Sequence, residues 1–475
     1  VAAQFAEGET GSANWKVKFG PVTISESAGY AYTVPADAFC YGLELEVAGT
    51  GGFKGTASTS ATVMAKIDGI SVSNMTPKFG DTLYASASCL VALPSVNYTW
   101  TFTNAEGDVV KTESGASYSV GYEDVGLTIT LSARTADSHY KVTAAPVSTA
   151  PVAWPEGYVT TEAELLDAVA NHQVGGKIVI ANDIYLTSAV QLDNFIGEIS
   201  GLRLSSALPW DFALASAENA RIFEIGAGSI VTLKNLEFFS TQVSTTKDGG
   251  IVYTNSPLRV ESCYFSRGNA KNGGAIFANQ TDLTLSDVTF EGNNAYGYGG
   301  AVFGYKSNLT VADSTFKDNW AMNSGAGIYF YGARQTMLAT GGVFSGNRAM
   351  YGGGIYADAG DFTINGVTMS LNVGSQGGGA IFQRSGSMTL DNSYIAGNIS
   401  GSSYGDISLY STAYFNAAVG DEEAGIPGTI GSNLTAKVYN YKNPTQSKVY
   451  DNYSGTANAI DSVFAEDVDE EFWVF

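Results

Sequence analysis

The chain has 475 residues, more than a single compact core usually serves, so we expect several domains. Its 24 Lys and Arg residues stand against 46 Asp and Glu residues, and the formal charge of −22 argues against nucleic acid or an anionic membrane surface as a partner. Only 15% of the residues are charged and 56 are glycine, a composition typical of turn-rich all-β proteins. The sequence has no run of about 18 apolar residues, so it predicts no membrane-spanning helix.

Residues 1–67 and 68–150 are each predicted to form an immunoglobulin-like β-sandwich, because short alternating stretches are separated by turn residues about every eight to twelve positions. The predicted core of the second sandwich is Leu83, Trp100, Tyr118, Val120, Val125, Ile129 and Leu131. The first sandwich repeats this spacing around Trp15, but only 14 residues precede that Trp, so its first strand is missing. The missing strand either precedes Val1 in a longer chain or comes from another subunit, and we expect Val1 to be a processed or internal start.

Residues 151–177 are predicted to be a linker followed by a cap. Thr161 and Glu164 have the spacing of a capping box, which opens a short amphipathic helix within 158–174. The apolar side of this helix is predicted to be Leu165, Leu166 and Val169. We expect it to lie over the first coil of a β-helix, where it protects unpaired strand edges.

Residues 178–440 repeat a pattern in which one apolar column recurs at intervals of 24, 26, 26, 27, 26 and 26 residues. The column is Val252, Ile276, Val302, Ile328, Ile355, Ile381 and Ile407. A second register places Phe, Met or Ile three residues before an Asn, and a third contains alternating apolar pairs. Each period therefore holds three short strand-like segments and none long enough for a helix. Stacked coils pair each strand with its equivalents, so we predict a parallel β-helix, right-handed by the crossover rule.

The Asn of the second register is predicted to be structural at each of its positions. These positions are Asn293, Asn319, Asn347, Asn372 and Asn398. A side-chain amide at a tight turn tolerates left-handed geometry and can bond the amide of the next coil, which favours a buried ladder over a row of sugar-contacting residues. The glycine pairs of the repeat, such as 273–274 and 299–300, are predicted to need positive φ or close packing.

An aromatic residue follows the apolar column in successive coils, as Tyr253, Phe277, Phe303, Tyr329, Tyr356 and Phe382. Adjacent strand residues face opposite sides, so these rings lie outside if the apolar column faces the lumen. A second aromatic set follows the Asn positions, as Tyr296, Tyr298, Trp320, Tyr351 and Tyr404. Two interpretations remain open: the rings are an interaction surface for a glycan or a partner, or they pack rung on rung and cover their own surface.

A carbohydrate-active lyase or hydrolase on a β-helix would need converging carboxylates, or a Ca²⁺ cluster with an Arg or Lys base. Asp287 and Asp313 fall on equivalent turns, but the next coil offers Gly341 there, which favours turn capping over a metal site. Asp358 and Asp361 are predicted to flank one turn in the same way.

Histidine and cysteine suggest no further chemistry. His139 falls in the second sandwich and His172 in the cap helix, so neither belongs to the β-helix. The three cysteines, Cys40, Cys89 and Cys263, lie in different predicted domains, and we expect buried free thiols. We therefore expect no enzymatic activity, catalytic residue, metal or cofactor, and keep the polysaccharide lyase or hydrolase as the alternative function.

Two family resemblances are carried by motifs of this chain. Residues 250–400, with GGAI or GGAV and FxxN, resemble the polymorphic membrane protein and adhesin-like β-helix repeats of bacterial and archaeal surfaces. The segments TPKFGDTLYA, YTW and GASYSVGYEDVGLTITL look like a bacterial immunoglobulin-like repeat. The resemblances imply an extracellular, surface-displayed protein that serves adhesion or assembly. Its partner would be a glycan, a protein receptor or another copy of itself.

Residues 441–475 are predicted to be a C-terminal cap or tail. The chain ends in an acidic stretch followed by four strand-favouring apolar residues, Phe472, Trp473, Val474 and Phe475. Either these residues fold back over the open end of the β-helix, or they complete the first sandwich of the next subunit and build a head-to-tail filament by strand donation.

Overall fold

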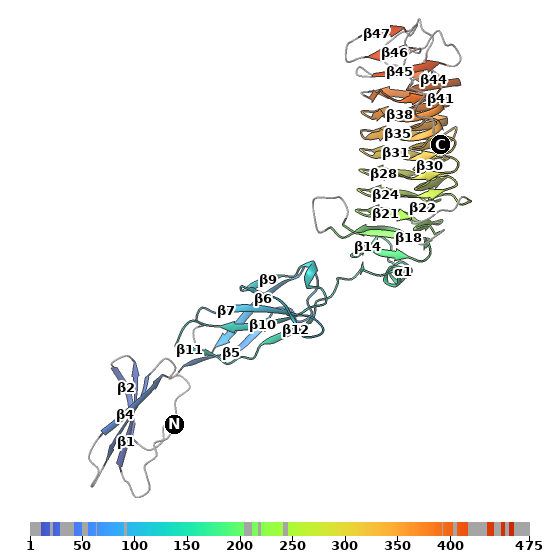
Figure 1. Cartoon of the computed structure of the whole chain (residues 1–475). Helices are drawn as coiled ribbons and strands as arrows, with labels where there is room; N and C mark the ends of the chain where they lie inside the picture. The colour runs from blue at the N-terminus through green and yellow to red at the C-terminus, as the bar shows by residue number, and fades with distance from the viewer. Residues whose placement is uncertain are drawn as a thin grey trace. The chain divides into compact units, whose positions relative to one another are not determined.

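The computed structural model describes residues 11–19, 22–28, 42–49, 56–62, 64–89, 93–203, 211–216, 220–240, 246–391, 393–401, 406–416, 435–440, 448–451 and 456–459 (Figure 1). The chain divides into two compact units, Val1–Glu156 and Gly157–Phe475, and each is described by itself. The described elements are β-strands apart from one α-helix and one short 3-10 helix, so the fold is all-β as predicted. The positions outside the described residues include Cys40, Tyr404 and the predicted donor strand Phe472, Trp473, Val474 and Phe475.

The first sheet of the N-terminal unit has the strand order β2-β1-β3-β4, and its neighbours are antiparallel. The bounds are Gly11–Phe19 (β1), Val22–Ala28 (β2), Gly42–Gly49 (β3) and Thr56–Thr62 (β4). Trp15 is buried, together with Leu43 and Leu45 of the neighbouring strand. The described residues of this region form one sheet, and its assignment as an immunoglobulin-like domain remains a prediction.

Two further sheets pack around a common core in the N-terminal unit, in the orders β12-β10-β7-β8 and β11-β5-β6-β9. The bounds are Ala65–Val72 (β5), Thr82–Cys89 (β6), Asn97–Thr103 (β7), Val109–Ser114 (β8), Ser117–Ser119 (β9), Tyr122–Asp124 (η1, a 3-10 helix), Thr128–Arg134 (β10), Tyr140–Val142 (β11) and Val147–Pro151 (β12). Strand β5 crosses the predicted boundary between residues 67 and 68. These sheets make a two-layer β-sandwich.

The core of this sandwich follows the prediction. Leu83, Trp100, Val120, Ile129 and Leu131 are buried. Tyr118 and Val125 are partly buried and pack against them. The side chains of Val72, Phe102 and Val152 complete the core. Alternating burial along each strand therefore identified the inward face correctly.

A buried carboxylate lies beside this core. Oδ2 of Asp124 accepts hydrogen bonds from the Tyr118 hydroxyl and the Gly121 backbone N–H, each at 2.7 Å. Its Oδ1 lies 2.6 Å from Nζ of Lys111. Burial raises the pKa of Tyr118 to about 12, so this hydroxyl stays protonated and donates. The charge of Asp124 is thus paired as well as hydrogen-bonded, which burial requires.

The second unit begins with a cap that is shorter than predicted. Residues 158–159 form strand β13 (Tyr158–Val159), which pairs in parallel with β14, and helix α1 spans Glu162–Ala170. Leu165 is fully buried, whereas Leu166 is 41% exposed, so the prediction that Leu166 faces inward is wrong. Adjacent residues of a helix point about 100° apart, so Leu166 turns away from the side on which Leu165 is buried. Ala168 and Val169, three and four residues after Leu165, lie on the buried side and pack against the core.

The capping box of this helix is also displaced by one residue. Oγ1 of Thr161 accepts a hydrogen bond from the Glu164 backbone N–H at 3.2 Å, as predicted. The return bond comes instead from the backbone N–H of Thr160, which donates to Oε2 of Glu164 at 2.7 Å. Two side-chain bonds therefore hold the start of the helix, and the donor of one of them, the Thr160 backbone N–H, lies one residue before the predicted capping box.

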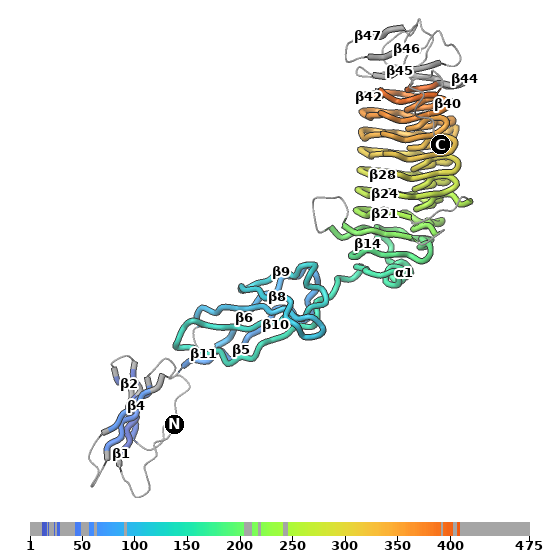
Figure 2. The backbone as a smooth tube through the Cα atoms, in the orientation of Figure 1, coloured from blue at the N-terminus to red at the C-terminus, as the bar shows by residue number. Residues whose placement is uncertain are grey.

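The body of the second unit is a parallel β-helix, and Figures 1 and 2 show its coils stacked from β14 to β42. One column of parallel strands is β14 (Gly176–Ile180), β17 (Ile196–Gly201), β20 (Ile230–Lys234), β23 (Leu258–Glu261), β27 (Leu283–Ser286), β31 (Leu309–Ala312), β35 (Thr336–Thr340) and the second halves of β38 (Ile355–Asn365) and β41 (Ile381–Asp391). The next column is β15 (Ile184–Leu186), β18 (Ala213–Ser216), β21 (Glu237–Ser240), β24 (Tyr264–Ser266), β28 (Thr289–Glu291), β32 (Thr315–Lys317), β36 (Val343–Ser345), β39 (Thr368–Ser370) and β42 (Tyr394–Ile395).

The third column carries the apolar positions that revealed the repeat. It is β16 (Val190–Leu192), β19 (Phe223–Ile225), β22 (Val252–Thr254), β26 (Ile276–Asn279), β30 (Val302–Tyr305), β34 (Ile328–Tyr331), the first halves of β38 and β41, and β44 (Ile407–Asn416). Strand β45 (Thr435–Asn440) continues it in parallel, followed by the antiparallel strands β46 (Lys448–Asp451) and β47 (Thr456–Ala459). Ile276 pairs with Val302, which pairs with Ile328, and all three are fully buried.

A fourth column of very short strands was not predicted. It consists of β25 (Asn269–Ala270), β29 (Asn294–Ala295), β33 (Trp320–Ala321), β37 (Arg348–Tyr351), β40 (Val373–Gly377) and β43 (Ile399–Ser400). The prediction of three strands per coil is therefore wrong from residue 269 onward. A strand of two residues is too short to show alternation, and its inward residue is the small Ala at 270, 295 and 321, which gives no apolar signal.

Candidate ligand-binding groove

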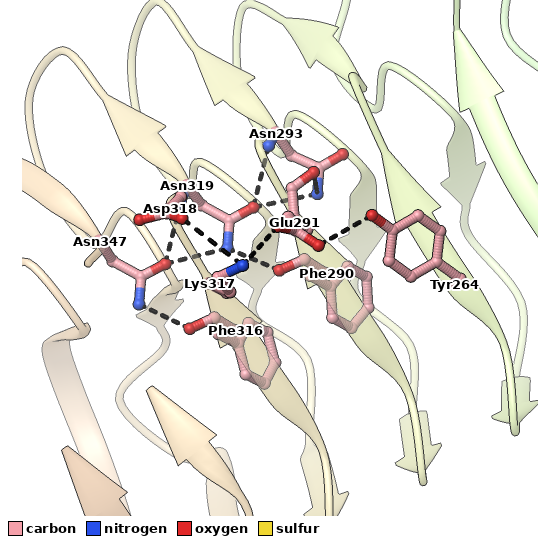
Figure 3. A network of polar contacts seen from close by, with 9 residues as sticks. All are labelled: Tyr264, Phe290, Glu291, Asn293, Phe316, Lys317, Asp318, Asn319 and Asn347. Atoms are coloured by element: carbon pink, nitrogen blue, oxygen red, sulfur yellow. Dashed lines mark hydrogen bonds and ion pairs between the residues drawn. The ribbon is translucent and has the colours of Figure 1, made fainter. Parts of the chain in front are cut away.

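The predicted asparagine ladder forms, and Figure 3 shows three of its members. The backbone N–H and Nδ2 of Asn319 both donate to Oδ1 of Asn347, at 3.1 and 2.9 Å, and Asn293 bonds Asn319 in the same way. Nδ2 of Asn319 also donates to the Phe290 carbonyl of the preceding coil at 3.0 Å. The bonding continues through Asn372 and Asn398. The first four amides are 0–1% exposed, so this row is structural.

The left-handed residue at this corner is not the Asn but the residue before it, which corrects the prediction. The corner residues are Arg267, Gly292, Asp318, Gly346, Leu371 and Gly397, with φ between 52° and 69°. The left-handed residue that makes the turn comes one position before each Asn, so the Asn side chain can point inward. The ladder ends at Asp406, whose Oδ1 accepts from the backbone N–H and Nδ2 of Asn398 at 3.0 and 2.9 Å.

The two carboxylate pairs singled out in the sequence occupy turns. Asp287 and Asp313 have φ of 55° and 49° and share their corner with Gly341 at 66°. Oδ2 of Asp287 accepts from the Ser262 hydroxyl at 2.9 Å, a bond between neighbouring coils. Both residues therefore make the corner turn, and the Asp287 side chain bonds a neighbouring coil rather than the backbone of its own turn.

Asp358 and Asp361 flank a turn made by the left-handed Ala359 and Gly360, as predicted. Asp358 is 7% exposed and its Oδ2 lies 2.9 Å from Nη1 of Arg384. The carboxylate of Asp361 is exposed and accepts from the Ser387 hydroxyl of the next coil. The two carboxylates thus have different partners and do not act as a pair.

The aromatic residues that follow the apolar column form a continuous row outside the lumen. We call Tyr253, Phe277, Phe303, Tyr329, Tyr356 and Phe382 the aromatic row. Five of them are only 5–8% exposed and form a cluster separate from the lumen core. Tyr329 stacks on Tyr356 with centroids 5.0 Å apart and planes at 6°, whereas Phe303 stands across the row at 78° to Tyr329. The rings therefore cover one another, which favours the packing interpretation for their faces.

Four rings of the aromatic row, Tyr253, Phe277, Phe303 and Tyr329, nevertheless form the floor of a groove with a volume of about 540 Å³. One wall is the residue two positions further along each strand, and Asn279, Tyr305, Tyr331 and Asp358 pair in register there. The other wall comes from the loops before the strands, with Asp248, Asn272 and Tyr298. The groove therefore combines aromatic rings with tyrosyl hydroxyls, side-chain amides and the charged side chains of Asp248, Asp358 and Arg384.

The polar groups of the groove are tied to one another. Nδ2 of Asn279 donates to the Tyr253 hydroxyl at 2.9 Å, and Nδ2 of Asn272 donates to Oδ1 of Asp248 at 2.8 Å. Burial, aided by the charge of Asp358, raises the pKa of Tyr329 far above its ordinary value. Its hydroxyl therefore stays protonated and donates to Asp358 at 3.4 Å. These bonds hold the amides of Asn272 and Asn279 and the Tyr329 hydroxyl in place in the groove.

The second aromatic set divides between the groove and another surface. Tyr298 lines the groove, and Tyr351 contacts Phe382 with ring centroids 5.1 Å apart. Tyr296 is 44% exposed and meets the half-buried Trp320 edge to face at 6.2 Å, away from the groove lining.

Sequence reasoning missed six lining residues: Asp248, Asn272, Asn279, Tyr305, Tyr331 and Arg384. The signal for the two tyrosines was available, because each follows a member of the aromatic row by two positions and so shares its face of the strand. Arg384 and Asp358 lie 26 residues apart and meet only because their coils are neighbours.

Neither a metal centre nor a membrane segment is found in the described part of the chain. No group of three or more His, Cys, Asp or Glu side chains there could hold a metal ion. No helix there is long and apolar enough to cross a membrane. Cys263 is buried, which raises the pKa of its thiol to about 12, and Cys89 is half-buried; both are free thiols.

Comparison with known proteins supports the fold. Residues 214–372 match the family model of the right handed beta helix region. No curated protein and no solved structure matches the chain significantly. The matched segment contains the groove-lining residues except Arg384, and the parallel columns agree with it. The second unit is therefore a right-handed parallel β-helix.

Proposed function

We propose that this protein is an extracellular, surface-displayed adhesin whose β-helix contacts its receptor through the groove over the aromatic row. The observation that carries the proposal is the groove itself, with an aromatic floor, tyrosyl hydroxyls and amides along its walls. Surfaces that combine rings with fixed polar groups are suited to binding glycans and protein partners. The resemblance of the repeats to those of surface adhesins points the same way.

The proposal is tested with the double variant Tyr305→Ala/Tyr331→Ala, which removes two stacked wall residues but no lumen residue. The purified chain is labelled and its binding to cells and to immobilised glycans is measured. We expect the variant to bind at least about tenfold more weakly, a loss of about 1.4 kcal/mol. Tyr185→Ala is the control, because Tyr185 is 55% exposed on β15 and lies outside the groove lining. Full binding by the double variant would refute this use of the groove.

A polysaccharide lyase or hydrolase is the second candidate, supported by the fold class and by the carboxylates of Asp248 and Asp358 in the groove. Both carboxylates are already hydrogen-bonded or ion-paired, which makes us prefer binding to catalysis. Polysaccharides are incubated with the chain, with and without Ca²⁺, and new chain ends are measured. Release of oligosaccharides that is lost in Asp358→Asn would replace the adhesin proposal with an enzyme.

For the N-terminal unit we propose immunoglobulin-like domains. The head-to-tail filament, in which residues 472–475 complete the first sandwich of the next subunit, is kept as the assembly proposal. Electron microscopy of the native material should show fibres, and deletion of residues 466–475 should abolish them. Undiminished polymerisation of the deletion variant would end the strand-donation proposal.

A further inference from the structure

We infer that the groove binds an uncharged polysaccharide chain lying along the axis of the β-helix, and that Asp358 is a specificity-determining residue that excludes acidic chains by neutralising Arg384. This inference rests on the proposed function, since it assigns a ligand class to the same groove.

The lining of the groove extends along the axis. It runs from Tyr253 on β22 through β26, β30, β34 and β38 to Arg384 on β41. Strands of adjacent coils are about 4.8 Å apart, so these five steps make a length of about 24 Å. A site of this length fits a chain of several sugar units better than a compact metabolite.

The lining is rich in groups that match sugar hydroxyls. Tyr298, Tyr305 and Tyr331 place hydroxyls along the walls, and Asn272 and Asn279 add amides. Hydroxyls and amides both donate and accept, as sugar hydroxyls do. Among the lining rings, Phe303 stands at 71° to Phe277 and at 78° to Tyr329, so the rings supply apolar surface beside the hydroxyls without forming one parallel stack. The hydroxyls and amides of the lining can therefore form hydrogen bonds with a polyhydroxylated chain.

The backbone of the groove offers no strand edge to an extended peptide. Strands β26, β30, β34 and β38 are each paired with the coil before and the coil after. A peptide that adds to a sheet needs unpaired N–H and C=O groups, which are absent from the floor of this groove in the described residues. The polysaccharide is favoured over a peptide on this ground.

The charge of the groove disfavours an acidic chain. Arg384 is the one cation among the described lining residues, and its Nη1 lies 2.9 Å from Oδ2 of Asp358. Asp358 is 7% exposed and accepts a hydrogen bond from the Tyr329 hydroxyl. Burial and this bond hold the carboxylate in position to pair with Arg384. Asp248 adds a second negative charge to the lining, and the whole chain carries −22. An acidic chain would meet net repulsion.

Further cations flank the groove without lining it, and among them Lys247 and Lys271 are exposed and directly precede the lining residues Asp248 and Asn272. Arg221 lies over the Tyr253 ring at 5.0 Å and its Nη1 bonds Oε2 of Glu224 at 2.9 Å, so its charge is also paired. Nζ of Lys306 lies over the Tyr305 ring at 5.2 Å. Lys306 is a position at which an acidic chain could still be attracted, and the test below includes it.

The test measures binding of the full chain to neutral polysaccharides (glucan, galactan, xylan, mannan) and acidic ones (polygalacturonate, alginate, hyaluronate). We expect the chain to bind at least one neutral polysaccharide. We expect its affinity for every acidic polysaccharide to be lower by a factor of about ten or more. Preference for an acidic chain overturns the inference but keeps the proposed function, and loss of that binding in Lys306→Gln would identify the cation. Absence of binding to any polysaccharide also overturns the inference. Cell adhesion that still depends on Tyr305 and Tyr331, or capture of extended peptides, would then leave the adhesin proposal standing.

The role of Asp358 is tested with Asp358→Asn, which keeps the shape of the side chain and removes the charge that neutralises Arg384. The ratio of affinities for polygalacturonate and for its uncharged methyl ester should rise about tenfold. Adding Arg384→Gln should return the ratio to that of the unmodified chain. Asp361→Asn, on the same strand but outside the lining, is the control and should leave the ratio unchanged.

A measurement on the unmodified chain covers the case in which the Asp358 variant fails to fold. Salt screens repulsion between exposed charges, so raising the NaCl concentration should narrow the gap between polygalacturonate and its methyl ester. A gap that does not change with salt, or a ratio unaffected by Asp358→Asn in a folded protein, contradicts the inference.

Discussion

Single residues of the β-helix are constrained mainly by the coil above and the coil below. The side-chain amide of Asn319 uses both of its groups to bond neighbouring coils, and the Phe290 carbonyl accepts its second N–H bond. A residue that must satisfy partners in two coils cannot be replaced alone. The same reasoning applies to the corner positions, where the backbone conformation rather than a contact sets the requirement.

Replacing Asn319 with Leu should destabilise the β-helix by about 1 to 3 kcal/mol, because buried donors and acceptors in both neighbouring coils lose their partner. Thermal or urea unfolding of the whole chain measures the change. Thr310→Leu is the control, since it adds a similar apolar side chain at an exposed position of β31. An Asn319 variant that melts with the unmodified protein would show that the ladder contributes little.

Leu371 occupies a corner for which its side chain is poorly suited. Its φ is 58° and its side chain is 63% exposed, whereas the equivalent corners at 346 and 397 are Gly with φ of 69°. Leu371→Gly should therefore stabilise the protein by about 1 kcal/mol, the order of the left-handed penalty for a residue with a Cβ. Leu338→Gly, at an exposed strand position, should do the opposite. Equal effects of the two substitutions would contradict the strain argument.

Glu237 predicts a pH dependence of stability. Burial, followed by the nearby charge of Asp183, raises the pKa of its carboxyl above the ordinary value. A raised folded-state pKa means that the folded protein holds the proton more tightly than the unfolded chain. Its stabilising contribution is thus complete below the unfolded pKa of about 4.3 and is lost as pH rises through the folded pKa.

Glu237→Gln should consequently become more stable relative to the unmodified chain as pH rises from about 4 toward neutrality. Unfolding midpoints of the two proteins, compared at several pH values, give the difference. A difference that stays constant or shrinks over this range would show that Glu237 is well solvated or paired.

At the scale of elements, the columns of strands and the cap do different work. In each column, similar side chains of successive coils stack on one another. The Phe316 and Phe344 rings are an example, with centroids 4.5 Å apart and planes at 6°. The cap has no repeat to extend and instead covers the first coil with Leu165. Because the first coil would otherwise expose an unpaired sheet edge, the cap also protects against association.

Leu165→Ala should cost about 2 to 5 kcal/mol, since it removes a fully buried side chain between α1 and the first coil. The neighbouring Leu166→Ala is a matched control, because Leu166 is 41% exposed and should cost far less. Unfolding curves and light scattering should show a less stable, more association-prone Leu165 variant. Similar losses from the two substitutions would mean that the helix does not dock through Leu165.

At the scale of the whole molecule, the repeat defines a stack in which each coil contacts mainly its neighbours. Any surface that runs along the axis is therefore assembled from residues about 26 positions apart. The groove is such a surface, and the pairing of Asp358 with Arg384 across 26 residues is an example of it. One coil alone would present neither the walls nor the ion pair.

The sequence by itself determined the β-helix, its register and the asparagine ladder, because equivalent side chains must stack on one another and so recur at a fixed interval. It also determined the inward face of the second sandwich, where alternation is long enough to read. Only the tertiary structure decided the fourth strand of the coils from residue 269 onward, the outward turn of Leu166, the corner residue before each Asn, and the groove. These depend on two-residue strands, on one-residue shifts and on neighbours from other coils, none of which leaves a pattern along the chain. The aromatic row shows the division clearly: its position outside the lumen follows from alternation, but the 5–8% exposure of five of its rings comes from packing against the rings of adjacent coils.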